Sequence, residues 1–295
     1  MEEQLGEALS GFDAALAQFR SALDTFPHLS GAVFDGTGDW MDLLRYKLVP
    51  HLGGNGCLVA SLAGGTNTGK STIFNILVQQ ELSPVRTTAA ATCRPVLAGN
   101  ARRYREGRDG LVVPEFTARA LDDPALVVSR DAAPADLFVV LSELLPDELV
   151  LLDTPDVDSI DKQNWAVAEQ IRAAGDVMIA VLTGEKYLDD RVVEFFRKAH
   201  DSGRIVLPLM NKANPDNDYA VAAEQLDEFC KAVGMEDAIY FVVPHNLQLE
   251  EDFLESDIQS LDGEFSLRDF LESLDVPSLK EDVYGDSIGH FVHKA

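Results

Sequence analysis

A glycine-rich segment that ends in lysine and serine is the part of this sequence best suited to do chemistry. Its residues, Gly64-Gly65-Thr66-Asn67-Thr68-Gly69-Lys70-Ser71, fit the pattern G-x-x-x-x-G-K-[ST] at every fixed position. An apolar run, Cys57–Ala63, precedes it, and a helical pattern that starts at Thr72 follows it. The N–H groups of such a loop and of the next helix's first turn point at one anion. We therefore expect Gly64 to Thr72 to hold the phosphates of a nucleoside di- or triphosphate, with Lys70 at the β- and γ-phosphates and Ser71 on Mg²⁺.

Three later segments complete a nucleotide site. Asp153 ends the apolar run Val150–Leu152, where a carboxylate beside the phosphate loop can hold Mg²⁺ through a water. The segment Asn211-Lys212-Ala213-Asn214 ends another apolar run, and Pro244-His245-Asn246 ends the last one. We expect a base to bind between these two ends. The candidate base contacts are Asn211, Lys212, Asn214, Pro244 and His245.

Strands and helices that alternate from Cys57 onward must position these loops. Besides Cys57–Ala63, we expect strands at Pro95–Ala98, Glu148–Leu152, Asp176–Leu182, Arg204–Met210 and Ile239–Val243, and helices at Thr72–Gln80, Lys162–Ala174, Leu188–His200 and Tyr219–Val233. Such alternation predicts an α/β fold with a mostly parallel sheet and helices on both faces. Ser266 is expected to cap a further helix.

The regions outside this alternation are less regular. Near the N-terminus, Leu5, Leu9, Phe12, Leu16, Phe19 and Leu23 alternate in spacing between four and three residues. This narrow apolar seam predicts a helix that either packs on its own domain or binds a partner or a second copy. A second helix is expected at Trp40–Val49, and the long insert before Asp153 is expected to form a hairpin and a helix at the sheet edge. We divide the chain into an N-terminal helical segment (1–52), the nucleotide-binding domain (53–275) and an uncertain tail (276–295).

Composition limits the classes of partner. The formal net charge of −26 over 295 residues disfavours nucleic acid and anionic membrane surfaces. The basic cluster Arg102–Arg108 is short and is expected to be a solvated loop or hairpin. The three cysteines have no paired spacing, the N-terminus lacks the pattern of a signal peptide, and no apolar stretch approaches the roughly 18 residues of a membrane-spanning helix. We therefore expect a cytoplasmic protein with no membrane segment.

Taken together, these motifs resemble those of GTP-binding proteins of the translation-factor-like class, nearest to the Era-like and dynamin-like branches. The resemblance rests on Gly64–Ser71 with Phe74-Asn75-Ile76-Leu77, on Leu82–Thr88, on Ala91-Thr92-Cys93-Arg94-Pro95, on Asp153-Thr154-Pro155 and on Asn211-Lys212, and it spans about Cys57 to Asn246. It implies a three-layer P-loop GTPase domain with helical additions at both ends, which binds GTP or GDP with Mg²⁺. It also implies that Thr92 is the switch threonine, although Thr87 and Thr88 compete for that role. Lys70 and Thr92 are then the candidate catalytic residues, and Ser71, Thr92 and Asp153 are the candidate metal ligands.

The chain departs from this family at two positions. Asp156 stands where the family has a glycine whose N–H contacts the γ-phosphate, and a carboxylate there would meet like charge. Asn214 stands where the family has the aspartate that accepts two hydrogen bonds from guanine. An asparagine leaves one of those donors poorly satisfied, and its NH₂ would suit a base that carries an oxygen there, as xanthine does. The family's water-positioning glutamine is also replaced, by Val157.

These observations favour a Mg²⁺-dependent guanine-nucleotide-binding protein that is a slow GTPase switch. Two alternatives stay open. One is a nucleotide-locked pseudo-GTPase scaffold that binds a protein partner, or a second copy, through its N-terminal helix. The other is a P-loop NTPase with altered base preference. A kinase or ATPase fits least, because Asn211-Lys212 has no place in it.

Overall fold

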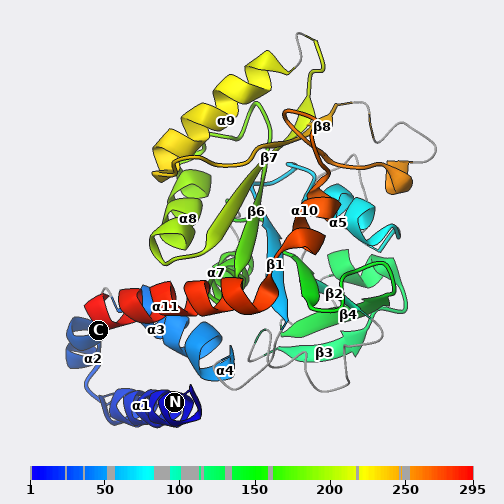
Figure 1. Cartoon of the computed structure of the whole chain (residues 1–295). Helices are drawn as coiled ribbons and strands as arrows, with labels where there is room; N and C mark the ends of the chain where they lie inside the picture. The colour runs from blue at the N-terminus through cyan, green and yellow to red at the C-terminus, as the bar shows by residue number, and fades with distance from the viewer. Residues whose placement is uncertain are drawn as a thin grey trace.

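The computed structural model of the chain describes residues 2–23, 25–35, 37–51, 57–82, 94–100, 113, 116–129, 135–158, 162–216, 219–245, 247 and 253–294. Within these residues, a nine-stranded sheet in the order β3-β4-β2-β5-β1-β6-β7-β8-β9 forms the centre of the molecule (Figure 1). The strands are β1 Leu58–Ala63, β2 Val96–Asn100, β3 Thr117–Ala120, β4 Asp136–Ser142, β5 Leu149–Asp153, β6 Val177–Leu182, β7 Ile205–Ala213, β8 Phe241–Pro244 and β9 Gln259–Ser260. Strands β5, β1, β6, β7 and β8 are parallel to one another, whereas β2 is antiparallel to β5 and β9 to β8.

Helices cover both faces of the sheet. They are α5 Lys70–Val78, α7 Lys162–Ala174, α8 Asp190–Asp201, α9 Ala220–Val233 and α10 Leu267–Ser273. Helices α5 and α10 share one apolar cluster with Val177 and Ile179 of β6, and α7, α8 and α9 share another with Met178 and Ala180 of the same strand. Because successive side chains of a strand point to opposite faces, a strand between two helical layers must be apolar throughout. The predicted three-layer α/β fold with a mostly parallel sheet is confirmed.

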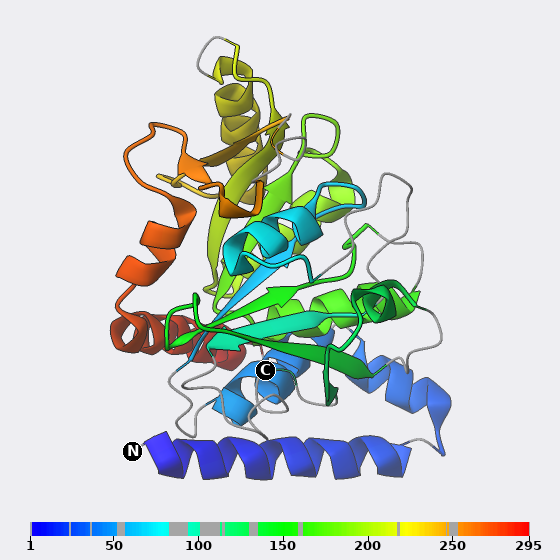
Figure 2. The same ribbon diagram turned by 90° about the vertical axis from the view of Figure 1, so that its right-hand side faces the viewer.

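A separate group of helices lies at the end of the molecule opposite α9 (Figures 1 and 2). It consists of α1 Glu2–Leu23, α2 Pro27–Phe34, α3 Gly38–Leu43, the π-helical turn η1 Leu44–Leu48, α4 Val49–His51 and α11 Val276–Lys294. Their core contains Leu9 of α1, Trp40 of α3 and Phe291 of α11, so the two ends of the chain pack together. Figure 2 shows α1 crossing the base of the molecule.

The apolar seam of α1 is only partly covered. Leu9 is buried and Leu16 packs against the same core, and the Phe12 ring lies 6.0 Å from the Phe291 ring. Phe12 and Phe19 nevertheless stay 41% and 49% exposed. The predicted packing of this helix on its own chain is therefore seen for part of the seam. Its partner role stays a prediction.

Residues 276–294 form a regular helix, α11, where the sequence analysis expects only an uncertain tail. The buried positions of α11 are Val276, Lys280, Val283, Ser287 and Phe291, at helical spacing. Lys280 and Ser287 are polar, and they interrupt the apolar periodicity from which a helix is predicted. Lys280 can be buried because its ammonium lies 3.5 Å from the Asp176 carboxylate. The domain boundaries themselves stay a prediction.

The insert before β5 extends the sheet, but its described strands do not form the predicted hairpin. Strands β3 and β4 pair in parallel, with Thr117 opposite Asp136, and the 3₁₀ helix η2 (Pro124–Val128) lies between them. Two strands of a hairpin are antiparallel, so this prediction is wrong for β3 and β4. The basic cluster Arg102–Arg108 lies outside the described residues. No described helix is both long enough and apolar enough to cross a membrane.

Candidate functional site

The phosphate loop joins the carboxyl end of β1 to the first residue of α5. Its last residue, Gly69, has a φ of +91°, a left-handed conformation that costs glycine little. The Thr68 hydroxyl donates to the Gly65 carbonyl oxygen at 2.9 Å, which fixes the turn. The loop therefore leads directly into a helix N-terminus, where N–H groups and the helix dipole favour an anion.

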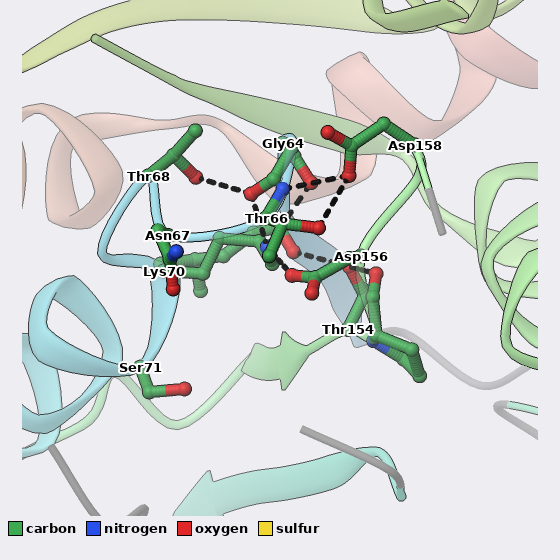
Figure 3. Close-up of polar contacts among 12 residues, drawn as sticks. Gly64, Thr66, Asn67, Thr68, Lys70, Ser71, Thr154, Asp156 and Asp158 are labelled. Atoms are coloured by element: carbon green, nitrogen blue, oxygen red, sulfur yellow. Dashed lines mark hydrogen bonds and ion pairs between the residues drawn. The ribbon is translucent and has the colours of Figure 1, made fainter. Parts of the chain in front are cut away.

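Lys70 lies over this loop rather than in solvent (Figure 3). Its ammonium donates to the carbonyl oxygens of Gly64 and Gly65, both at 3.0 Å, and to Asp156 Oδ1 at 2.5 Å. The side chains of Lys70 and Asp156 are 4% and 7% exposed. Asp156, whose carboxylate is expected to meet like charge at a γ-phosphate, thus directs that carboxylate at the lysine that would bind phosphate.

Two oxygen groups lie together where Mg²⁺ is expected. The Ser71 hydroxyl donates to Asp153 Oδ2 at 2.8 Å, and Asp153 is fully buried at the end of β5. The Thr154 hydroxyl, next in sequence, donates to the Leu62 carbonyl oxygen at 2.7 Å and ties β5 to β1. Mg²⁺ prefers hard oxygen ligands and usually uses one or two protein groups together with substrate phosphates, so this pair fits the ion. Thr92, the third expected ligand, and its competitors Thr87 and Thr88 lie outside the described residues.

The end of β7 holds the phosphate loop from its other side. The Asn211 side-chain amide donates to the Thr68 carbonyl oxygen at 2.8 Å, and the Lys212 ammonium donates to the Asn67 carbonyl oxygen at 2.9 Å. Asn211 is 1% exposed, whereas Lys212 is exposed. Two side chains expected at the base are therefore bound to the loop expected at the phosphates, and the two parts form one unit.

Asn214 lies at the surface just beyond β7. Its amide donates to Asp216 Oδ2 at 3.1 Å, and its Oδ1 accepts from the Asp216 N–H at 3.1 Å. The His245 N–H donates to the Ala213 carbonyl oxygen at 2.9 Å, which brings the end of β8 beside this turn. Pro244 is half-buried and His245 is exposed. The expected base contacts thus share one edge of the sheet, with a carboxylate beside Asn214.

Two residues at the phosphate loop were missed by the sequence analysis. Asp158 Oδ1 accepts from the Thr66 N–H at 2.7 Å and from the Thr66 hydroxyl at 2.8 Å (Figure 3). Its Oδ2 accepts from the Lys186 ammonium at 2.7 Å. Burial by itself raises the pKa of Asp158, but the hydrogen bonds from Lys186 and Thr66 outweigh it and lower that pKa below its usual value. Lys186 follows the carboxyl end of β6. That position was the available signal, since ligand-binding loops gather at the carboxyl ends of parallel strands.

This fold and this loop define the class of P-loop nucleotide-binding proteins. Comparison with known families shows which family of that class the chain belongs to. A family model described as "50S ribosome-binding GTPase" matches residues 59–212, just over half of the chain. The chain belongs to this GTPase family. No curated protein matches its sequence.

Solved structures resemble the chain at low sequence identity. Era in complex with MgGDPNP and nucleotides of 16S ribosomal RNA has a TM-score of 0.42 and 16% identity, over 68% of this chain and 56% of that one. A chain of an oligomerised bacterial dynamin pair has a TM-score of 0.49 and 12% identity, over 98% of this chain and 47% of that one. Toc33 from Arabidopsis thaliana has a TM-score of 0.45 and 13% identity, over 83% of this chain and 94% of that one. The chain thus spans about half of the Era and dynamin chains. At these values the structures assign it neither a substrate nor a partner.

Proposed function

We propose that this protein binds GDP and GTP together with Mg²⁺ and is a slow GTPase switch. The observation that carries the proposal is the attachment of Asn211 and Lys212 to the carbonyl oxygens of Thr68 and Asn67. Family membership alone supports a GTP-binding domain. The attachment supports the rest of the proposal, because it holds the residues proposed to contact the base in a fixed relation to the loop proposed to bind the phosphates.

Each part of the site has a defined task in this proposal. The N–H groups of Gly65, Asn67, Thr68, Gly69 and Lys70 bind the phosphates, and the Lys70 ammonium neutralises their charge. Ser71, Asp153 and Thr92 hold Mg²⁺, which supplies further charge neutralisation during phosphoryl transfer. The base lies against Asn211, Lys212, Asn214, Pro244 and His245.

The surroundings of Val157 support slow hydrolysis. Its side chain is 1% exposed and belongs to the apolar cluster under α8 and α9, and its N–H donates to the Gly64 carbonyl oxygen at 3.2 Å. This position therefore supplies no polar group that could orient an attacking water. Hydrolysis then needs another water-orienting group, from this chain or from a partner, besides positioning and charge stabilisation.

Phosphate release from GTP, with and without Mg²⁺, tests this proposal. The unmodified chain should release phosphate slowly and only with Mg²⁺. Lys70→Ala should abolish release because the phosphates lose their cation, and Ser71→Ala should remove the Mg²⁺ dependence together with most of the rate. Lys231→Ala, on exposed α9, is the matched control and should change nothing. Release that survives Lys70→Ala would contradict the proposal.

A second role, as a binding scaffold, is favoured by one observation on α1. Leu5, Phe12 and Phe19 on the seam are 36%, 41% and 49% exposed although their helix lies on the protein. Three exposed apolar side chains along one helix form a surface that a partner or a second copy would cover. This role does not exclude nucleotide binding, since α1 lies at the base of the molecule (Figure 2).

A further inference from the structure

Asp158 makes contacts at the phosphate loop that the tasks assigned above do not use. One carboxylate accepts hydrogen bonds from the Thr66 N–H, the Thr66 hydroxyl and the Lys186 ammonium, all between 2.7 and 2.8 Å. Its side chain is only 7% exposed. Two neutral donors and a cation around one oxyanion form an anion-binding site, and here a side chain of the same protein fills it.

The shape of the loop is adapted to this contact. A Cβ atom on Gly65 would lie 3.0 Å from Asp158 Oδ2, so a larger residue there would press on the carboxylate and move it by a few tenths of an ångström. Arg191, in the first turn of α8, donates from Nη1 to the Asp158 carbonyl oxygen at 3.2 Å and holds the backbone of the residue. Asp158 is therefore held at the loop by its backbone as well as by its carboxylate.

The position of this anion site along the phosphates follows from Lys70. The lysine of such a loop reaches the β- and γ-phosphates, and Lys70 contacts Asp156, two residues before Asp158. The Asp156–Asp158 segment thus lies on the Lys70 side of the loop, whereas Asn211 and Lys212, expected at the base, are bound to the carbonyl oxygens of Thr68 and Asn67. A third phosphate and the Asp158 carboxylate would need the same donors.

We propose that the Asp158 carboxylate is an internal competitor for the terminal phosphate, which a triphosphate must displace from Thr66 and Lys186 and which a diphosphate leaves in place. This inference rests on the proposed function and deepens it. Once displaced, Asp158 leaves Lys186 facing the terminal phosphate, so Lys186 becomes a phosphate-binding residue from the same chain. The hydrogen bond to Asp158 raises the pKa of Lys186, which agrees with a charged ammonium in this contact.

Asp156 should act differently because it pairs with Lys70, which serves both the β- and the γ-phosphate. Removal of its charge, as in Asp156→Asn, is expected to raise the affinities for GDP and for a triphosphate together. Removal of the Asp158 charge should raise only the affinity for the triphosphate. The ratio of the two affinities therefore separates the two aspartates.

Calorimetric titration with GDP and with the non-hydrolysable guanosine 5′-(β,γ-imido)triphosphate, both with Mg²⁺, tests the inference. The proteins are the unmodified chain, Asp158→Ala, Lys186→Ala and the double variant. Asp227→Ala and Lys231→Ala, from an exposed ion pair on α9 with 3.7 Å between its charges, are the matched controls. Binding is the readout, so the test does not depend on hydrolysis.

Asp158→Ala should raise the ratio of triphosphate to diphosphate affinity by about tenfold to a hundredfold, the range of one charge-assisted hydrogen bond. In that background Lys186 has lost its carboxylate partner, so adding Lys186→Ala should lower the ratio again by about tenfold. An Asp158→Ala ratio equal to that of the unmodified chain would overturn the competition. A double variant equal to Asp158→Ala would overturn the role of Lys186.

Two further measurements keep these outcomes separate from other failures. Circular dichroism checks that each variant folds, and Asp158→Asn, which keeps the side-chain shape but removes the charge, should raise the ratio in the same direction if Asp158→Ala does not fold. GDP affinity should stay within about threefold across the Asp158 and Lys186 variants, because a diphosphate leaves the contact between these residues in place. Failure of the unmodified chain to bind GDP would reject the proposed function itself, whereas an unchanged ratio with intact GDP binding rejects only this inference.

Discussion

Three aspartates follow one another at the end of β5, and their surroundings give them different tasks. Asp153 is fully buried and accepts from the Ser71 hydroxyl, so it suits a metal ion. Asp156 pairs with the Lys70 ammonium, and Asp158 is held by Thr66 and Lys186. Identical side chains therefore meet a hydroxyl, the lysine proposed to bind phosphate and a phosphate-loop amide. At the scale of single residues, the partner decides the chemistry.

Asn214→Asp is predicted to raise the affinity for GDP by about tenfold to a hundredfold, because a carboxylate accepts from both guanine donors where an amide accepts from one. The same change should weaken binding of XDP. Parallel calorimetric titrations of GDP and XDP measure both effects, and Gln4→Glu on α1 adds an equal charge far from the site as the control. Equal GDP affinity before and after the substitution would mean that Asp216, already hydrogen-bonded to Asn214, serves as the missing acceptor.

The sequence was sufficient to propose most of the single residues at this site, because the loop pattern and Asn211-Lys212 carry their own spacing. Asp158 and Lys186 could not be found in this way. They are 28 positions apart in sequence, and only the parallel pairing of β5, β1 and β6 brings the segments that follow β5 and β6 to one edge. The ion pair between them is a property of the folded sheet rather than of a motif.

At the scale of elements, short polar contacts fix how helices lie on the sheet. Ser266 caps α10, with its hydroxyl accepting from the Asp269 N–H at 3.1 Å and the Asp269 carboxylate accepting from the Ser266 N–H at 3.2 Å. From the same helix, Arg268 donates to the carbonyl oxygens of Ile76 and Leu77 at the end of α5. Helix α10 therefore satisfies carbonyl groups of the helix that begins at the phosphate loop.

Ser266→Ala is predicted to lower the free energy of unfolding by about 1 kcal/mol, because the first turn of α10 loses its capping hydroxyl. Urea unfolding followed by circular dichroism measures this change. Ser273→Ala, at the exposed end of the same helix, is the control and should have little effect. Nucleotide affinity should stay unchanged in both variants. A stability loss no larger than that of the control would contradict the role of the cap.

The seam of α1 gives a second prediction at this scale. Substitution of Leu5 and Phe19 by serine should reduce any self-association or partner binding, because both side chains are exposed, whereas nucleotide affinity should not change. Light scattering over a range of concentrations measures self-association directly. Val221→Ser, an exposed apolar side chain on α9, is the matched control. A mass equal to that of one chain at every concentration, before and after substitution, would exclude self-association through α1.

Sequence patterns failed at the element scale where buried positions are polar and where strands close in sequence pair in parallel instead of forming a hairpin. Helix α11 buries Lys280 and Ser287 in positions that a periodic pattern expects to be apolar. Strands β3 and β4 are close in sequence and yet pair in parallel, which their local sequence does not specify. Both features depend on partners elsewhere in the fold.

At the scale of the whole molecule, the two ends of β1 and β6 carry different polar clusters. The phosphate loop follows the carboxyl end of β1. At the amino ends, the buried Asp176 accepts from the Val59 N–H at 2.8 Å and pairs with the ammonium group of Lys47 in η1, which is fully buried. Lys280 of α11 lies 3.5 Å from the same carboxylate. This cluster fastens both terminal helical segments to the sheet.

The buried Lys47 predicts a pH dependence of stability. Burial lowers the pKa of Lys47 to about 7, against the opposing pull of Asp176, whereas an unfolded lysine has a pKa of about 10.4. Between these values the unfolded chain binds more protons than the folded chain, so the free energy of unfolding contributed by Lys47 rises with pH. Urea unfolding at pH 7 and pH 9 should show this rise in the unmodified chain.

Lys47→Met should remove the rise between pH 7 and pH 9, because the side chain whose pKa differs between the folded and the unfolded chain is gone. Lys231→Met, on the exposed surface of α9, should keep it. If Lys47→Met retained the full rise, the buried ammonium would not be its source.

Calorimetric titration of the unmodified chain and of Lys70→Ala with GDP and ADP, both with Mg²⁺, tests the central claim most directly. The arrangement of Asn211, Lys212 and the phosphate loop predicts that GDP binds at least about tenfold more tightly than ADP and that Lys70→Ala loses most of this binding. Equal affinities for GDP and ADP, or GDP binding that does not depend on Lys70, would contradict a guanine-nucleotide site at this loop.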